Sequence, residues 1–309
     1  MRKILKIASN VDVTSKYLGK YYFDFSEILN PTWPFDDEGV RLRPYPPPLF
    51  HQYHPMVVAE YALDCYRLYL ETNNEDYKKS FLNNALWFVK NQKVIEGKIG
   101  LWLYYFQDTR RYNISVPFAS AMSQGYGISL LLRAHEITGD GTFLNPAYYA
   151  LNSYEYDVIH GGIRNYLKGH VFFEEAPSIP PSYIMNGFIF SLLGLYDLYR
   201  YEANEKAMTL FNEGIDTLKK HLHLYDLGYW SRYNLQYNKY LASKYYHNIH
   251  IIQLDILYRI TNEKVFLDYS EKWNSYRNNT ICLLKYYKEF YFYRYLYKLQ
   301  RIKSFFESF

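Results

Sequence analysis

The chain has 309 residues, of which 49% are hydrophobic and 21% are charged, and this balance excludes a disordered protein. With only two cysteines, Cys65 and Cys282, it cannot build a disulfide framework or a four-cysteine zinc site. The net charge of +4 is accounted for by residues 285–309, where six Lys or Arg stand against two Glu, so the sequence lacks the widespread basic stripe of a nucleic-acid-binding protein.

The amino-terminal region predicts an extended arm. We expect residues 1–50 to form this arm and to pack on the domain that follows. Lys6 interrupts the first apolar run, so the pattern does not indicate a signal peptide, and a cytoplasmic location is expected.

Four helical hairpins are predicted after the arm, each made of a helix, a short polar turn and a returning helix. In the first helix, Val57, Tyr61, Cys65 and Leu68 recur at the spacing of one helical face. The first helix of the third hairpin is apolar nearly all round, as a helix with neighbours on both sides must be. The hairpins are expected at residues 57–92, 119–154, 184–222 and 250–276, with turns near Thr72, Thr138, Glu202 and Thr261.

The spacing of these turns indicates the architecture. They lie 66, 64 and 59 residues apart, a longer period than that of tetratricopeptide or ankyrin arrays. Hairpins of this length are typical of α/α barrels. We therefore predict an all-α fold in which residues 51–280 form an α/α barrel (toroid) of alternating inner and outer helices.

Three connecting segments are predicted to lie at one rim of this barrel. Residues 93–118, 155–181 and 223–246 each leave an outer helix and enter the next inner one. They are rich in Gly, Pro and Tyr and contain short β-like pieces, which favours β-hairpin insertions there. Loops on a rigid scaffold commonly carry function, so the ligand is expected at this rim.

Two adjacent carboxylates stand in the second of these segments. Glu174 and Glu175 precede Pro177, and in an extended chain they would point to opposite sides. One is therefore expected to face the cleft and the other to brace a loop, although a surface acidic pair fits the two residues alone equally well.

The third segment offers phenols beside cations. Tyr233 follows Arg232, and Lys244 precedes a stretch that places Tyr246 and His250 on one helical face. His247 and His250 could alternatively be metal ligands, but there is no HExxH signature, so we predict no metal site. The chain also lacks a Gly-rich phosphate loop and a nucleophile elbow, and no cofactor is expected.

The carboxyl-terminal tail, residues 281–309, is basic and aromatic. It is expected to cap the barrel with its rings inward and its basic groups outward, while contact with an anionic membrane surface is a second reading. Its apolar runs fall short of the roughly 20 residues that span a bilayer. A homodimer is also plausible because exposed charge is scarce.

From about His51 to Tyr276 the chain resembles the C-terminal catalytic domain of the D-glucuronyl C5-epimerases. The resemblance rests on short motifs spread along this range. They are Tyr53-His54-Pro55 with Glu60-Tyr61-Ala62-Leu63, Ser120 to Gly125 with Arg133-Ala134, Phe143-Leu144-Asn145, Glu174-Glu175 with Pro177, Asn186-Gly187-Phe188 to Leu198, Leu224-Tyr225-Asp226, Tyr233-Asn234-Leu235, Tyr246-His247, His250 and Gln253-Leu254.

The resemblance implies that tyrosines act as acid and base, with two of three family positions at Tyr233 and Tyr246. The third falls at Ala176, so Glu174 or Glu175 is expected in its place. Gln236 stands where the animal pattern has Arg, and Arg232 could supply that contact. The residues expected to bind substrate are Tyr53, His54, Gln124, Asn186, Arg232, Lys244, His247 and His250.

The activity implied is that of a uronosyl C5-epimerase, which interconverts D-glucuronate and L-iduronate residues in a polysaccharide. Its partner is then a uronate-containing polysaccharide and not a nucleic acid. A free phenol has a pKa near 10, so a base at pH 7 needs neighbours that favour the phenolate, and Arg232, Lys244 or His247 could do so. The alternatives are a uronate polysaccharide lyase and a glycan-binding protein that has lost catalysis through Ala176.

Overall fold

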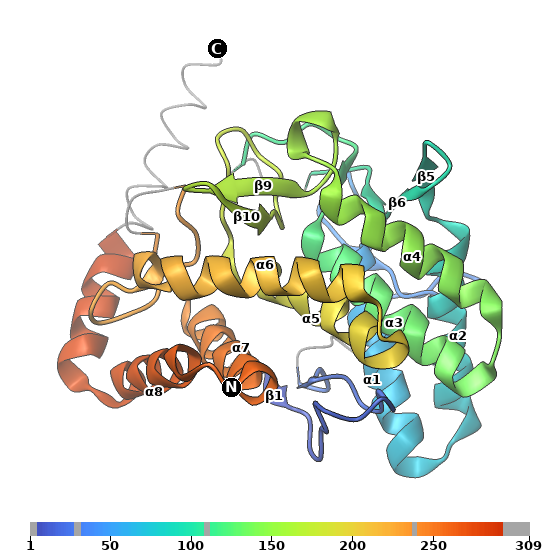
Figure 1. Cartoon of the computed structure of the whole chain (residues 1–309), viewed down its shortest axis with the longest axis horizontal. Coiled ribbons are helices and arrows are strands. Elements are labelled where there is room, and N and C mark those ends of the chain that lie inside the picture. The colour runs from blue at the N-terminus through green and yellow to red at the C-terminus, as the bar shows by residue number, and fades with distance from the viewer. Residues whose placement is uncertain (1–4, 28–31, 108–111, 237–239, 293–309) are drawn as a thin grey trace. The chain divides into compact units, whose positions relative to one another are not determined.

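The computed structural model describes residues 5–27, 32–107, 112–236 and 240–292 (Figure 1). The protein is mostly helical, with short two-stranded β-hairpins, as predicted. Its chain divides between His221 and Leu222 into two compact units, which we call unit 1 and unit 2. This division differs from the predicted one into arm, barrel and tail. The predicted domain bounds stay a prediction.

Unit 1 contains three helical hairpins, and they confirm the first three that the sequence predicts. Within it, α3 packs against both α1 and α5, while α2, α4 and α6 each pack on their own hairpin partner. Inner and outer helices therefore alternate in this unit, whereas the closed toroid stays a prediction. The helices are α1 (Pro55–Thr72), α2 (Glu75–Lys90), α3 (Ala121–Thr138), α4 (Leu144–Asn152), α5 (Met185–Glu202) and α6 (Glu205–His221).

Glycines let the two central helices of unit 1 touch. A Cβ added at Gly194 of α5 would lie 2.4 Å from the carbonyl oxygen of Gly125 in α3, and one at Gly125 would lie 2.6 Å from the carbonyl oxygen of Phe190. Real Cβ atoms do not approach backbone so closely, so the backbones themselves are in contact. Because neighbours surround α3, its residues from Ala121 to Ala134 are all buried.

Helix ends explain why the turns fall where they do. Each of the first helices α1, α3 and α5 ends on a residue in the left-handed conformation, at Asn73 (φ 53°), Gly139 (φ 68°) and Ala203 (φ 53°). Asn and Gly adopt this conformation readily, whereas Ala does so at a cost of about 1 kcal/mol. The side chains of Asn74 and Asp140 then accept hydrogen bonds from the backbone N–H groups of the next helical segment.

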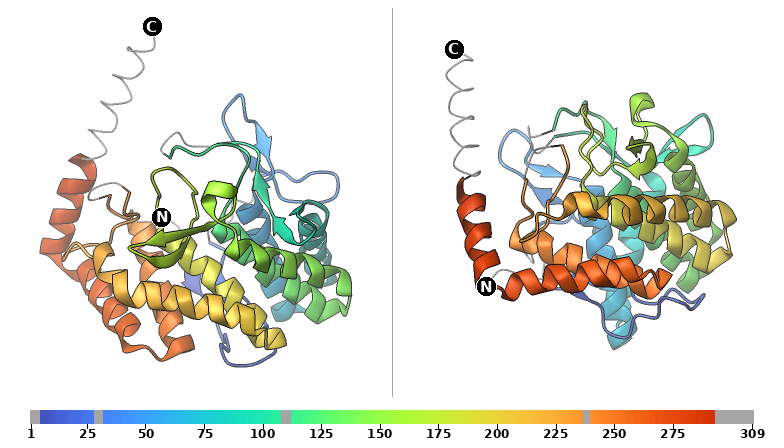
Figure 2. Two further views of the ribbon diagram at one scale, coloured as in Figure 1. Left: turned by 45° about the horizontal axis from the view of Figure 1, so that its top comes forward. Right: turned by 60° about the vertical axis from the view of Figure 1, so that its left-hand side comes forward.

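The described strands form five antiparallel two-stranded sheets. Two of these, β5–β6 and β9–β10, fall within the predicted rim segments 93–118 and 155–181, and a third, β7–β8, extends one residue beyond the first segment. In Figures 1 and 2 the pairs β5–β6 and β9–β10 lie on the same side of the helices of unit 1. The two segments also meet, since the N–H of Ile179 donates to the carbonyl of Asn113 at 3.2 Å. The hairpins pair β1 (Lys6–Ile7) with β2 (Phe23–Asp24), β3 (Arg43–Pro44) with β4 (His51–Gln52), β5 (Lys93–Ile95) with β6 (Ile99–Leu101), β7 (Leu103–Tyr104) with β8 (Phe118–Ala119), and β9 (Arg164–Leu167) with β10 (His170–Phe173).

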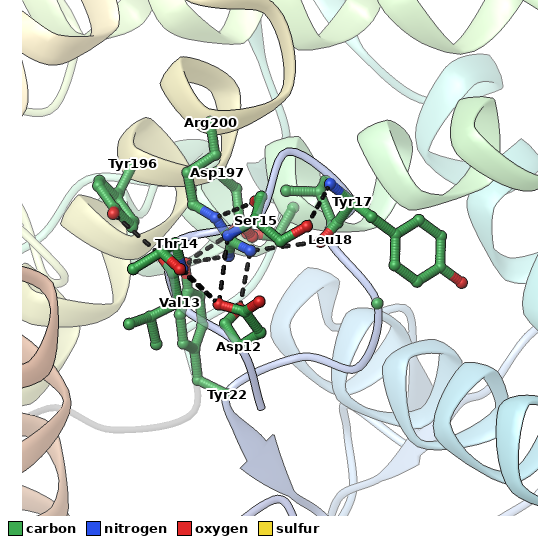
Figure 3. A network of polar contacts seen from close by, with 12 residues as sticks. Asp12, Val13, Thr14, Ser15, Tyr17, Leu18, Tyr22, Tyr196, Asp197 and Arg200 are labelled. Atoms are coloured by element: carbon green, nitrogen blue, oxygen red, sulfur yellow. Dashed lines mark hydrogen bonds and ion pairs between the residues drawn. The ribbon is translucent and has the colours of Figure 1, made fainter. Parts of the chain in front are cut away.

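A buried ionic network ties the described part of the amino-terminal arm to helices α3 and α5 (Figure 3). Asp197 of α5 forms ion pairs with Arg133 at 2.6 Å and with Arg200 at 3.5 Å, and it accepts a hydrogen bond from the Tyr22 hydroxyl at 2.7 Å. The guanidinium of Arg200 also donates to the carbonyl groups of Asp12 and Ser15. Because every charge has a partner, this network can remain buried and fix the course of the arm.

Unit 2 contains α7 (Lys244–Thr261), α8 (Lys264–Asn278) and a further helical stretch at residues 280–292. The fourth predicted hairpin is present, but α7 begins at Lys244 and not at the predicted His250. The reason is a helix cap, because the Ser243 side chain accepts a hydrogen bond from the N–H of Tyr246. Residues 293–309 of the predicted tail lie outside the described residues. Among the described helices, none is both long and apolar enough to cross a bilayer.

Candidate functional site

The two adjacent glutamates have different environments in unit 1. The Glu174 carboxylate is fully buried, where it accepts hydrogen bonds from the Ser182 hydroxyl at 2.6 Å and from the Tyr183 N–H at 3.1 Å. Burial raises the pKa of Glu174 to about 8, although these hydrogen bonds oppose the shift. Its backbone also joins two elements, because the Glu174 carbonyl accepts from the N–H of Ala121 at the start of α3. This is the position of a residue that braces its loop.

Glu175 is half-buried and lies against the first turn of α5. Its Oε2 atom accepts a hydrogen bond from the Asn186 side chain at 3.1 Å. A Cβ added at Gly187 would lie 2.2 Å from the same oxygen. Any side chain at position 187 would therefore clash with the Glu175 carboxylate in this position. The first turn of a helix favours a negative charge, because its free N–H groups make the positive end of the helix dipole.

A further carboxylate, that of Glu60, interacts electrostatically with Glu175. The sequence did not single it out as a site residue. Glu60 of α1 is half-buried and accepts a hydrogen bond from the Tyr126 hydroxyl at 3.4 Å. Burial raises the pKa of Glu60 to about 8; the hydrogen bond from Tyr126 and the charge of Arg43 lower it, and repulsion by Glu175 raises it further. A carboxyl group with such a pKa holds a proton at neutral pH.

Tyr104 and Arg43 complete this group, which we call the carboxylate cluster: Glu60, Glu175, Tyr104 and Arg43. The Tyr104 hydroxyl lies 2.6 Å from the Ser123 hydroxyl. Burial raises the pKa of Tyr104, the negative charge of Glu175 adds to the shift and the positive charge of Arg43 opposes it. Glu175 and Arg43 thus act with opposite sign on the pKa of both Glu60 and Tyr104. The sequence signal for Glu60 was an acid inside the otherwise apolar run from Val57 to Leu63.

His54 and Tyr53 border this cluster in different ways. The His54 ring packs edge-on against Tyr104, with centroids 4.8 Å apart, and burial followed by the charge of Arg43 holds its pKa well below the usual range. Tyr53 remains 42% exposed, stacks on Trp87 and donates its hydroxyl to Asp36 at 2.7 Å. That hydrogen bond raises the pKa of Tyr53 to about 12. His54 is therefore uncharged at neutral pH, and Tyr53 keeps its proton.

Gln124, also predicted to bind substrate, is fully buried. Its Oε1 atom accepts from the N–H of Trp102 at 3.0 Å, and its Nε2 atom donates to the carbonyl of Gly100 at 2.7 Å and to the hydroxyl of Ser153 at 2.9 Å. Both ends of the amide are thus engaged inside the protein. These hydrogen bonds hold the β6 segment against α3, so Gln124 has a structural role.

In unit 2 the two candidate catalytic tyrosines lie side by side. The rings of Tyr233 and Tyr246 have centroids 4.6 Å apart. Tyr233 is positioned by its N–H, which donates to the carbonyl of Tyr240 at 2.8 Å. Tyr246 is positioned by the capped first turn of α7. The rings of Tyr240 and Tyr245 pack on this pair at 5.9 Å and 5.3 Å, so four phenols gather here.

His247 and His250 lie inside unit 2, where both share one serine. The Ser231 hydroxyl is 2.7 Å from Nδ1 of His247 and 2.9 Å from Nδ1 of His250. Burial lowers the pKa of His247 to about 3 and holds that of His250 well below the usual range, so both rings are neutral at pH 7. Since Ser231 precedes Arg232 and Tyr233, this buried network fixes the segment that carries them.

The three residues that could favour a phenolate, His247, Lys244 and Arg232, differ in their charge and in their contacts. His247 is neutral, as just described. The ammonium of Lys244 donates to the Tyr287 hydroxyl and lies 4.5 Å from the centre of that ring. Arg232 is half-buried and directly precedes Tyr233 in the chain. No group of three His, Cys, Asp or Glu that could hold a metal ion occurs within residues 5–27, 32–107, 112–236 and 240–292.

Comparison with known proteins gives one family and several relatives. Residues 96–275 match the family model described as D-glucuronyl C5-epimerase C-terminus. The chain is 31% identical over 240 residues to the uncharacterized protein MJ1128 of Methanocaldococcus jannaschii, a match that covers 72% of this chain and 77% of that one. It is also 31% identical over 222 residues to the D-glucuronyl C5-epimerase of Caenorhabditis elegans, covering 65% of this chain but only 35% of that longer protein.

A solved structure, that of the Lin0763 protein from Listeria innocua, aligns with 72% of this chain and 56% of its own. The TM-score is 0.44 and the sequence identity is 17%. This similarity is too low to support a conclusion about fold or function.

Proposed function

Because the chain belongs to the D-glucuronyl C5-epimerase C-terminal family, we propose that it is a uronosyl C5-epimerase, which interconverts D-glucuronate and L-iduronate residues in a polysaccharide. The observation that carries the proposal is the pairing of Tyr233 and Tyr246, whose rings lie 4.6 Å apart. These are the two positions at which the family resemblance places acid–base tyrosines.

The chemistry requires a base and an acid at one carbon atom. The C5 proton lies next to a carboxylate, and its removal gives an enolate that must be reprotonated from the opposite face. A phenol with a pKa near 10 costs about 4 kcal/mol to ionise at pH 7 unless its surroundings favour the phenolate. Near Tyr233 the charge of Arg232 would do so. Near Tyr246 the positive end of the α7 dipole would add about 0.3–1 kcal/mol.

We assign the part of the absent third tyrosine to the carboxylate cluster. Ala176 cannot transfer a proton, but Glu175 directly precedes it. The electrostatic effect of Glu175 on Glu60, whose pKa it raises, supports this assignment, because it places Glu175 near an acid that holds a proton at neutral pH. Glu174 is less suited, since its oxygens are engaged by Ser182 and Tyr183. Arg43 is the cation that would meet the charge of the uronate or its enolate.

The proposal is tested by incubating the protein with heparosan-type or other glucuronate polymers. Nuclear magnetic resonance should detect iduronate signals that grow with time. Ultraviolet absorbance should stay constant, because epimerisation creates no double bond. A rise in absorbance would identify a lyase, in which the same proton abstraction is followed by loss of the O4 substituent.

Binding without turnover on every polymer would instead favour a glycan-binding protein that has lost catalysis. In that case the Ala176→Tyr variant should gain activity. If the unchanged chain is already fully active, this alternative is removed.

A further inference from the structure

The helical stretch at residues 280–292 has one buried face. Tyr286 is 1% exposed, and its ring lies 4.3 Å from that of Trp230 and 5.1 Å from that of Phe290. The contact with Trp230 holds the stretch against the rest of unit 2.

The other face of this stretch exposes large apolar side chains. Ile281 is 66% exposed, Leu284 is 64% exposed and Tyr291 is 59% exposed. At about 100° per residue, the three side chains fall within an arc of about 80° on the helix. We call this surface the tail face. Apolar side chains grouped on one helical face mark an interaction site more often than scattered single residues do.

The tail face also has a uniform positive charge. Lys285 and Lys288 are exposed beside its apolar residues, while Glu289, the acidic residue of this stretch, is half-buried. The sequence after residue 292 adds four more basic residues against Glu307, namely Arg294, Lys298, Arg301 and Lys303. The partner of this surface should therefore be both apolar and negatively charged.

We propose that the tail face is a docking surface for an anionic lipid bilayer, on which the helix lies in the plane of the membrane surface. Ile281 and Leu284 would enter the boundary between headgroups and acyl chains, and Tyr291 would place its hydroxyl among the headgroups. Lys285 and Lys288 have long stems that can follow the apolar surface while their ammonium groups reach lipid phosphates. Each basic residue near such a surface strengthens binding by roughly fivefold.

A second copy of the chain fits the tail face less well. A two-fold contact would bring Lys285 and Lys288 close to the same residues of the copy, and no exposed acid of residues 280–292 would separate them. Like charges in an interface oppose association. An anionic bilayer meets the same lysines with opposite charge.

The experiment is co-sedimentation of the full chain with lipid vesicles. The protein should sediment with vesicles of phosphatidylcholine mixed with phosphatidylglycerol and release at high salt, and should bind pure phosphatidylcholine much more weakly. A Lys285→Gln, Lys288→Gln variant should lose on the order of 25-fold in partition coefficient, from about fivefold for each lysine. An Ile281→Ser, Leu284→Ser variant should lose at least about tenfold, because it removes the apolar anchors.

Matched controls keep the test specific. Lys79→Gln with Lys264→Gln removes two exposed lysines elsewhere, and Ile159→Ser removes an apolar side chain that is 75% exposed; both should bind like the unchanged chain. Tyr286 is left intact in every variant, and circular dichroism verifies that the helix is retained.

Two outcomes would overturn the proposal. One is the absence of binding to anionic vesicles, or equal binding by the tail-face variants. The other is a dimer in light scattering that only the Ile281→Ser, Leu284→Ser variant loses, without any lipid binding, which would assign the face to a second copy. Neither outcome bears on the proposed epimerisation, which is measured separately on soluble polymer.

Discussion

Gly187→Ala is the substitution that tests the placement of Glu175 most sharply. Position 187 lies in the first turn of α5, where alanine would ordinarily stabilise the helix by about 0.5–1 kcal/mol relative to glycine. Here the added Cβ would lie 2.2 Å from Oε2 of Glu175 and 2.4 Å from its Cβ. Because the Cβ of Glu175 is tied to the backbone, a rotamer change cannot relieve the clash, and the loop itself must shift.

Overpacking of this kind costs about 1–3 kcal/mol, which exceeds the gain in helix propensity. We expect a net loss of about 1 kcal/mol, or a fall in Tm of about 2–4 °C for a unit of this size. Activity should fall by at least about tenfold, because a proton-transfer group moved out of position loses most of its contribution. The two effects are separable, since activity is measured well below the Tm.

Gly141→Ala is the matched control, because a Cβ there meets nothing within 4 Å and its φ is not left-handed. It should leave activity unchanged and Tm equal or slightly higher. Thermal unfolding and iduronate formation are measured on both variants. If Gly187→Ala behaves like Gly141→Ala in both assays, Glu175 does not lie against the first turn of α5 and the assignment of the carboxylate cluster fails.

Three further predictions concern the tyrosine pair, a helix cap and pH. Tyr246→Phe should lower iduronate formation by about 10²–10⁴-fold, whereas Tyr245→Phe, the neighbouring phenol, should change it little; equal effects would remove the assigned role of Tyr246. Ala203→Gly should stabilise the protein by about 1 kcal/mol in chemical unfolding, because Ala203 ends α5 in the left-handed conformation at φ 53°, and no gain would contradict that geometry. Glu60 has a folded pKa of about 8, above its unfolded value, so its contribution to stability is present at acidic pH and lost as pH rises through about 8. The Tm of Glu60→Gln relative to the unchanged chain should therefore increase from pH 5 to pH 8, and a difference independent of pH would exclude the raised pKa.

Local patterns in the sequence predict the helical hairpins well and the electrostatics of the candidate site poorly. The helices follow from apolar periodicity and from turn residues such as Asn73 and Gly139, which act within a few positions. The early start of α7 was missed because Ser243 caps the helix through a single side chain. The serine itself is the local signal, because Ser is among the preferred N-cap residues.

The partners of Glu175 could not be predicted in this way. Glu60 and Tyr104 are distant from it in the sequence, yet in the folded chain the charge of Glu175 raises the pKa of each. The neutral state of His247 likewise depends on burial beneath Trp230, whose ring is stacked on it at 3.8 Å. Periodicity alone does not carry that information.

Hydrogen exchange at carbon 5 of the uronate residues tests the proposed chemistry most directly. The unchanged chain, incubated with a glucuronate polymer in heavy water, should introduce deuterium at C5 of the uronate residues, in glucuronate that has returned to its original configuration as well as in iduronate. If no polymer of this class acquires deuterium at C5, the protein does not transfer protons at that carbon, and the roles assigned to Tyr233, Tyr246 and Glu175 are wrong.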